Sequence, residues 1–144
     1  MSSISKDLLL AYKNTDYVVY ASPNFTLHIS EYSVPFLKLA NTQDSKQAVF
    51  ITAHNPYSCV KTPSQNKAAQ NQLRAEIIKN GWRYFEGIGQ SKDLSWKEES
   101  FLVFGIDRLR AQNLCERYDQ QAVVWIDEHA TPELIFSSLR KNSV

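Results

Sequence analysis

The stretch Thr52–Ser58 gathers side chains that could bind a ligand or carry out chemistry. It places hydroxyl, imidazole and carboxamide groups directly after the apolar run Ala48–Ile51, which is typical of a buried strand. Binding and catalytic residues are often found in loops at strand ends. Pro56 favours an extended backbone at Asn55, whose amide can both donate and accept hydrogen bonds. The predicted ligand contacts in this loop are Thr52, Asn55 and Ser58.

Two amides from other segments are expected to converge on this loop. Ser64 is a suitable N-cap for the helix that follows, and the N–H groups of a helix start, where Asn66 lies, favour anions. Gln121 precedes the predicted strand 122–126, whose start should lie beside the end of strand 48–51. We therefore predict that these residues bind a small polar or anionic ligand, with a nucleotide as one candidate. The alternative is that the loop side chains only satisfy backbone groups.

A second cluster surrounds the acidic pair Glu98 and Glu99. Adjacent residues of a strand point to opposite faces, so at most one of these carboxylates can face a pocket. Trp96 is expected to anchor the preceding loop rather than to stack on a ligand. Gly87 and Gly89 lack the third glycine and the following helix of a dinucleotide-binding motif. The alternative for the acidic pair is a solvated strand edge.

Searches for a nucleophile or a metal site narrow the enzymatic hypotheses. No serine lies in a Gly-x-Ser-x-Gly segment, and Cys59 and Cys115, without metal or redox spacing, are expected to be buried free thiols. The three histidines also lack metal-ligand spacing, so we predict no metal site, and no pattern identifies a cofactor. His54 is the best candidate for a general base. The rival to ligand binding is a hydrolase or nuclease that uses Glu98 or Glu99 with His54.

The remaining pattern predicts the elements that position these side chains. From residue 48 onward the order is strand, helix, strand, strand, helix, strand, which is the ferredoxin-like split βαβ order over residues 48–127. Its predicted strands are 48–51, 82–88, 100–106 and 122–126, with a loop over 89–99 and helices after Ser64 and Asp107. The preceding residues are expected to add a helix, a hairpin and a second helix, over 6–13, 17–29 and 33–41. A last helix is predicted over 131–140.

Length and composition indicate one α+β domain over residues 1–144. The 43% of hydrophobic residues is typical of a globular protein, so one compact core is expected. The net charge of +1 leaves no basic patch of the kind that drives nucleic-acid binding. The N-terminus lacks a secretory signal, and no segment approaches the roughly 20 apolar residues needed to cross a bilayer. We therefore expect a soluble, cytoplasmic protein without membrane contact.

A third hypothesis is an interaction protein that forms homo-oligomers. Helices on one face of a four-stranded sheet leave the other face in need of cover. The N-terminal hairpin and the C-terminal tail could supply that cover within the chain. Otherwise Phe101, Val103 and Trp125 would drive dimerisation.

Several of these segments together resemble a known family. They are Ile51–Ser58, Asn66, Leu73, Gly87–Gly89, Trp96–Phe101 and Gln121–Trp125. Their order and spacing are similar to an uncharacterised family of small bacterial proteins, a domain of unknown function with a Thr-Ala-x-Asn-Pro-x-Ser segment, over residues 10–127. The resemblance implies a bacterial, stand-alone cytosolic protein and brings no activity to any residue. His54 occupies a variable position of the segment, so the resemblance favours binding over proton transfer.

Overall fold

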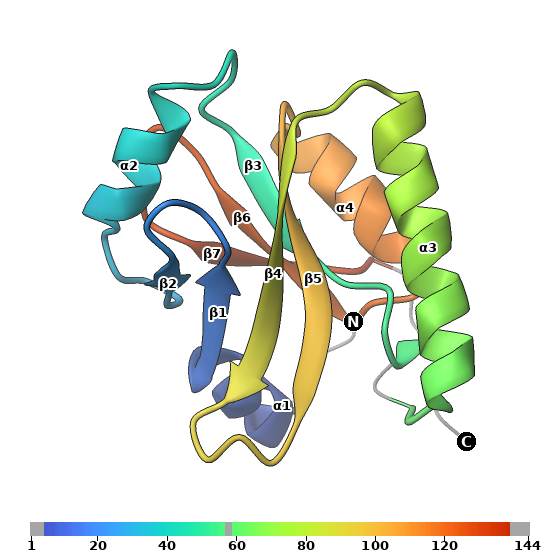
Figure 1. Ribbon diagram of the computed structural model, residues 1–144. Coiled ribbons are helices and arrows are strands. Elements are labelled where there is room, and N and C mark those ends of the chain that lie inside the picture. Colours follow the sequence, from blue (N-terminus) through green and yellow to red (C-terminus); the bar gives the residue numbers. More distant parts are fainter. Residues whose placement is uncertain (1–4, 57–58, 139–144) are drawn as a thin grey trace.

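The computed structural model describes residues 5–56 and 59–138, which form a curled antiparallel sheet with helices on both sides (Figure 1). The described helices are α1 (Lys6–Lys13), α2 (Val34–Ala40), α3 (Pro63–Lys79) and α4 (Arg108–Arg117). The strands are β1 (Thr15–Val19), β2 (Phe25–Leu27), β3 (Ala48–Ile51), β4 (Tyr84–Ser91), β5 (Lys97–Phe104), β6 (Ala122–Ile126) and β7 (Glu133–Phe136). Their order across the sheet is β2-β1-β4-β5-β3-β6-β7, and neighbouring strands are antiparallel. The predicted α+β class is confirmed.

Four strands at the centre of the sheet carry the segments singled out in the sequence. They lie in the order β4-β5-β3-β6, so β5 separates β3 from β4 although α3 connects those two strands. β3 and β6 begin and end as predicted. The predicted strands 82–88 and 100–106 are shifted toward each other, because β4 begins and ends later than predicted and β5 begins and ends earlier. The loop expected over residues 89–99 therefore shrinks to residues 92–96. Its polar side chains close a tight turn, in which Asp93 accepts hydrogen bonds from the Ser91 hydroxyl (2.8 Å) and the Ser95 N–H (3.0 Å).

Each described helix begins at a residue whose side chain caps it. Ser33 caps α2 and Asp107 caps α4, both as predicted. The predicted cap of α3 at Ser64 is wrong, because the cap lies two residues earlier, at Thr62. The Thr62 hydroxyl accepts a hydrogen bond from the Gln65 N–H, and the Gln65 side chain accepts one from the Thr62 N–H. This reciprocal capping box satisfies the backbone N–H groups of Thr62 and Gln65.

The C-terminal segment forms a strand rather than the predicted helix. β7 pairs with β6 at the edge of the sheet, with Val123 opposite Ile135. Leu134 packs into the core on one face of the sheet and Ile135 into the core on the other, so consecutive apolar residues suit a strand that is covered on both sides. The edge of β6 also offers backbone groups that a pairing strand satisfies. The predicted helix from residue 139 onward lies outside the described residues.

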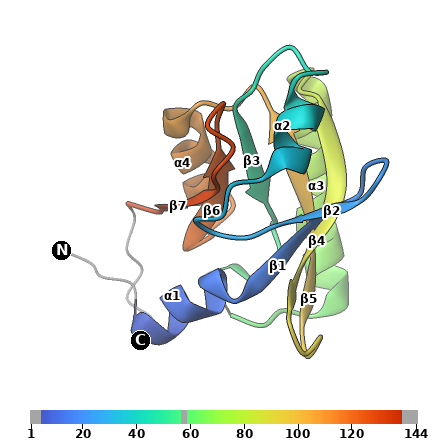
Figure 2. The same ribbon diagram turned by 90° about the vertical axis from the view of Figure 1, so that its left-hand side faces the viewer.

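Two apolar cores lie on opposite faces of the sheet. α3 and α4 cover one face, and α2 lies over the other (Figures 1 and 2). Val19 and Leu27 of the N-terminal hairpin are buried on the α2 side. On the α3 side, Phe101, Val103 and Trp125 are at most 4% exposed, so they leave no surface for the dimerisation considered above. The homo-oligomer hypothesis itself stays a prediction.

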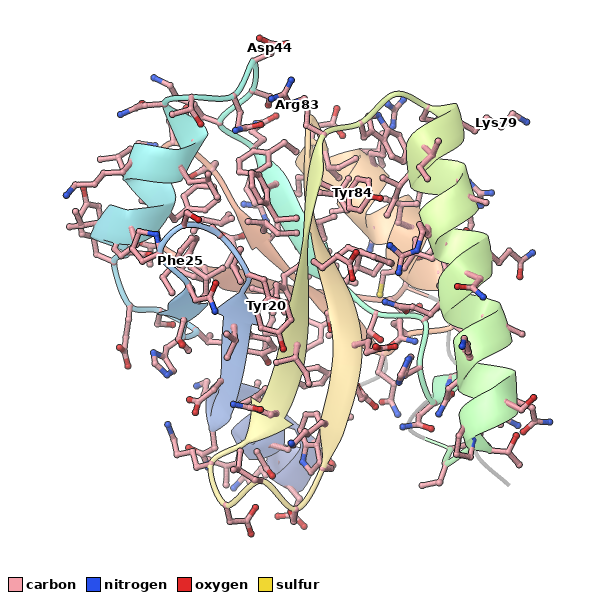
Figure 3. All side chains as sticks on the ribbon, viewed as in Figure 1. Tyr20, Phe25, Asp44, Lys79, Arg83 and Tyr84 are labelled. Carbon is pink, nitrogen blue, oxygen red and sulfur yellow. The ribbon has the colours of Figure 1, made fainter. Side chains whose placement is uncertain are left out.

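Two charged residues mark the end of the molecule opposite α1. Figure 3 shows Lys79 projecting from the end of α3 and Asp44 at the tip of the loop between α2 and β3. Asp44 is exposed. None of the described helices combines the length and the apolar character that a membrane span requires.

Candidate functional site

A pocket of about 390 Å³ opens between α1 and the sheet. It lies on the α2 face of the sheet at the end near α1, because Phe50 and Val124 of the core on that face line it together with residues of α1. Its described lining residues come from α1, from strands β1, β3, β4, β5 and β6, and from the loops next to β3, β5 and β6. Apolar side chains dominate the lining, among them Leu8, Phe50, Val60 and Val124.

The pocket exists because several lining positions carry small side chains. Gly89 and Ser100 belong to β4 and β5, and Ala122 begins β6. A Cβ atom added at Gly89 would meet no atom nearer than 3.9 Å, so a methyl group fits there in ordinary van der Waals contact. Farther along β5 the same face carries Leu102 and Phe104, which are 0% and 2% exposed and fill the space between sheet and α2. The hollow is therefore confined to the α1 end of this face.

α1 covers the pocket only in part. Leu8 and Tyr12 line it, yet no residue of α1 is fully buried. The helix is tied to β1, because the Thr15 hydroxyl donates to the Ala11 carbonyl (2.6 Å) and the Tyr17 hydroxyl donates to the Tyr12 carbonyl (2.8 Å). Burial raises the pKa of Tyr12 well above its ordinary value, so its phenol stays protonated. Tyr12 thus gives the pocket a neutral polar group.

Asn55 is hydrogen-bonded through both polar atoms of its side chain. Its Oδ1 accepts from Asn66 Nδ2 (3.0 Å) and from the Lys61 N–H (3.0 Å), and its backbone N–H donates to Asn66 Oδ1 (2.9 Å). Its Nδ2 donates to Glu98 Oε2 (2.8 Å). The predicted extended backbone is wrong, because Asn55 has a φ of 47°, a left-handed conformation that asparagine tolerates. These contacts favour the alternative in which Asn55 satisfies loop groups, and they add a role in holding Glu98.

Glu98 brings a carboxyl group into the apolar pocket. It lines the pocket and is half-buried, whereas Glu99 is exposed and is not among the described lining residues. Burial raises the pKa of Glu98, and the hydrogen bond from Asn55 offsets part of that rise. No residue in the ranges 5–56 and 59–138 forms an ion pair with Glu98. Its carboxyl group can therefore accept hydrogen bonds from a ligand, or donate one when protonated.

A buried glutamine that the sequence pattern did not reveal braces the loop from the α3 side. Gln70 is 3% exposed, its Oε1 accepts from the Ala53 N–H (2.9 Å), and its Nε2 donates to the Glu99 carbonyl (2.9 Å). The Thr52 hydroxyl donates to the same carbonyl (2.7 Å). A signal for this role existed, because Gln70 precedes Leu73 by three residues on the buried face of α3, where a polar side chain needs partners.

Gln120, rather than the predicted Gln121, reaches the pocket. Gln120 lines it, is 7% exposed, and donates from Nε2 to the His54 carbonyl (3.1 Å). Gln121 is half-buried and is not among the described residues that line the pocket. Successive side chains at a strand start point to opposite sides, so a difference of one residue changes the side.

The structure brings some of the other predicted residues to the pocket and places others elsewhere. Thr52 and Trp96 line it, and Trp96 is 41% exposed. Asn66 is hydrogen-bonded to Asn55 and is not among the described lining residues. His54 is absent from the described lining, and its Nε2 is buried without a hydrogen-bond partner among the described residues. Burial lowers the pKa of His54, so its ring is mainly neutral at neutral pH. Ser58 lies outside the described residues.

The other candidate ligating side chains are dispersed. The described residues contain no group of three His, Cys, Asp or Glu side chains that could hold a metal ion. Cys59 and Cys115 are free thiols as predicted, but Cys59 is exposed, in the loop after β3, and only Cys115 is buried. Burial raises the pKa of Cys115 to about 12, which keeps this thiol protonated and unreactive.

Comparison with known proteins places the chain in a family. No curated protein and no solved structure gives a significant match. The sequence model of one family, described as a protein of unknown function (DUF3293), matches residues 51–123, just over half of the chain. The match begins at the last residue of β3 and ends inside β6, so it includes Asn55, Gly89 and Glu98. The predicted membership of a domain family of unknown function is confirmed, and the chain belongs to DUF3293.

Proposed function

We propose that this protein binds a small, mostly apolar molecule in the pocket beside α1, with a polar group of the ligand reaching Glu98. The observation that carries the proposal is a half-buried carboxyl group in an apolar pocket of about 390 Å³. Small-molecule sites typically measure roughly 300–1,000 Å³ and combine apolar walls with a few polar groups that orient the ligand. Here Glu98, Tyr12 and Gln120 supply such groups.

The anionic ligand expected from the sequence has less support than a neutral or cationic one. The start of α3 was its expected partner, but the Gln65 N–H donates to the Thr62 hydroxyl and the Asn66 N–H to the Thr62 carbonyl. The capping box thus occupies donors that an anion would need. An ionised Glu98 would also repel a phosphate or carboxylate at close range.

A hydrolase or nuclease has less support than a binding module. That hypothesis requires His54 and an acidic residue on one substrate, but the described lining of the pocket includes Glu98 without His54 or Glu99. His54 Nε2 has no hydrogen-bond partner within the described part of the chain, so no partner on that nitrogen orients the ring as a base.

For the scaffold, we propose the ferredoxin-like split βαβ arrangement over residues 48–127. Its support is the chain order β3-α3-β4-β5-α4-β6 together with the spatial order β4-β5-β3-β6. In such a scaffold β5 lies between the two strands that α3 joins. This arrangement brings Glu98 of β5 beside the loop that follows β3.

The binding proposal is tested with phenylbutanol, a neutral probe that has an apolar body and one polar group. Titration into the ¹⁵N-labelled protein should shift the amide signals of Gly89, Glu98 and Ser100 in NMR spectra. Gly89→Leu should abolish these shifts, because Gly89 lines the pocket and the leucine side chain would extend into it. Thr26→Leu adds the same side chain at an exposed position of β2, outside the described pocket lining, and should leave binding intact.

Absence of shifts at the pocket in the wild type would overturn the proposal. Equal binding by Gly89→Leu and the wild type would overturn it as well, since the probe would then bind elsewhere.

A further inference from the structure

We infer that the ligand is a cationic amine carried on an apolar body, with its ammonium group paired to Glu98. The inference rests on the proposed binding function and specifies the chemical class of the ligand. It follows from a mismatch between the charge of Glu98 and its surroundings, which a bound cation would remove.

Glu98 differs from other partly buried acids of this chain. The Asp16 side chain is 26% exposed and contacts His28 and Lys92, and the Glu76 side chain is 14% exposed and pairs with Arg117. The carboxyl group of Glu98 has only the neutral amide of Asn55 as a hydrogen-bond partner within the described ranges. A buried charge is costly unless it is paired, so a cation is the partner that this position lacks.

The geometry leaves one oxygen of the carboxylate available. Asn55 Nδ2 donates to Oε2, and no described residue donates to Oε1. A carboxylate oxygen can accept hydrogen bonds from an ammonium group, which has donors and no acceptor. Asn55 is itself fixed by Asn66 and by the Lys61 N–H, so the carboxylate is held in place before a ligand arrives.

The other groups of the pocket are compatible with an amine on an apolar body. Leu8, Phe50 and Val124 provide apolar walls for the body, and the ring of Trp96 offers a face that attracts cations. Lys97 also lines the pocket, but it is exposed and forms no ion pair with Glu98. Its ammonium group is therefore free to remain in water while its carbon chain borders the pocket.

The test compares three probes with the same body and different head groups: phenylbutylamine, phenylbutanol and phenylbutyrate. Calorimetric or NMR titration of the wild type should give the amine an affinity about tenfold higher than the alcohol, because a charge-assisted hydrogen bond is stronger than a neutral one. Phenylbutyrate should bind more weakly than both. Glu98→Gln should remove the preference, so that the amine and the alcohol bind this variant with about the same affinity. Asp44→Asn removes one acid at the far end of the molecule and should preserve the preference (Figure 3).

The outcomes separate this inference from the binding proposal. Pocket binding of the alcohol with equal or weaker binding of the amine would overturn the inference and leave the binding proposal standing. A preference for the amine that persists in Glu98→Gln would also overturn it. Failure of all three probes to shift the signals of the pocket residues would overturn both.

Discussion

The two faces of the sheet are built from the same strands, yet one is filled and the other is hollow at one end. On the α3 side, Leu73 and Phe101 are at most 1% exposed and belong to a continuous core. On the α2 side near α1, Gly89 and Ser100 leave a pocket of about 390 Å³. Since successive side chains alternate, β5 contributes Phe101 to the filled face and Glu98 and Ser100 to the hollow one.

The buried polar side chains of the two faces differ in how completely they are hydrogen-bonded. On the filled side, both polar atoms of the Gln70 side chain form hydrogen bonds to the backbone. Glu98 on the hollow side has one neutral partner within the described residues and a pKa raised by burial. Satisfied polar groups hold a fold together, whereas an incompletely satisfied acid in a pocket is typical of a functional site. We therefore expect substitutions on the filled face to change mainly stability, and substitutions at the hollow end of the other face to change mainly the proposed ligand binding.

The largest effect on stability is expected from a cavity in the core of the filled face. Leu73→Ala removes a side chain that is 0% exposed and should lower the free energy of unfolding by about 2–5 kcal/mol. Leu8→Ala on the hollow face should cost less than about 1 kcal/mol, because Leu8 is half-buried beside space that is already open. Urea unfolding measures both values. Equal losses in the two variants would contradict the difference between the faces.

Two glycines on β4 should respond in opposite directions to the same change. A Cβ at Gly87 would overlap the backbone oxygen of Val18, so Gly87→Ala should destabilise the protein by about 1–3 kcal/mol. A Cβ at Gly89 meets nothing nearer than 3.9 Å, so Gly89→Ala should stabilise it by about 0.5–1 kcal/mol. Thermal and urea unfolding compare the two variants. Destabilisation by Gly89→Ala as large as that of Gly87→Ala would show that the space above Gly89 is filled.

The smallest effect concerns stability as a function of pH. Because the folded state raises the pKa of Glu98, the folded protein binds more protons than the unfolded chain between the two pKa values, and stability falls as pH rises through that window. At neutral pH the ionised Glu98 therefore costs stability. Glu98→Gln should raise the free energy of unfolding at neutral pH, with a smaller gain in acid. Urea unfolding across this pH range tests the trend, and a loss of stability at neutral pH would contradict it.

Much of the fold could be predicted from local patterns. β3 and β6 are short apolar runs, and the caps Ser33 and Asp107 act within one turn of their helices, so their signals are local. The C-terminal segment is predicted wrongly because its conformation depends on pairing with β6, which the apolar pattern of the segment itself does not report. The Thr62 cap was missed because Ser64 has the same capping chemistry two residues later.

The candidate site was predictable in parts and not as a whole. Asn55 and Glu98 were both named from the sequence, but their contact joins positions 43 residues apart and follows from the pairing of β3 with β5. Tyr12 belongs to α1, and no pattern in the sequence connects that helix with Asn55 or Glu98. The hollow itself depends on how small residues from several strands, including Gly89, face one another. The periodicity of a single segment therefore cannot predict the volume of the pocket.

A carbon-detected NMR titration of the Glu98 carboxyl group tests the central claim most directly, with Glu98→Gln used to identify the signal. A half-buried carboxylate without a cationic partner should titrate above its ordinary pKa in the free protein, and its pKa should fall when phenylbutylamine is bound, because the ammonium group stabilises the ionised form. An ordinary pKa that does not change with the amine would contradict both the burial of Glu98 and its role in binding.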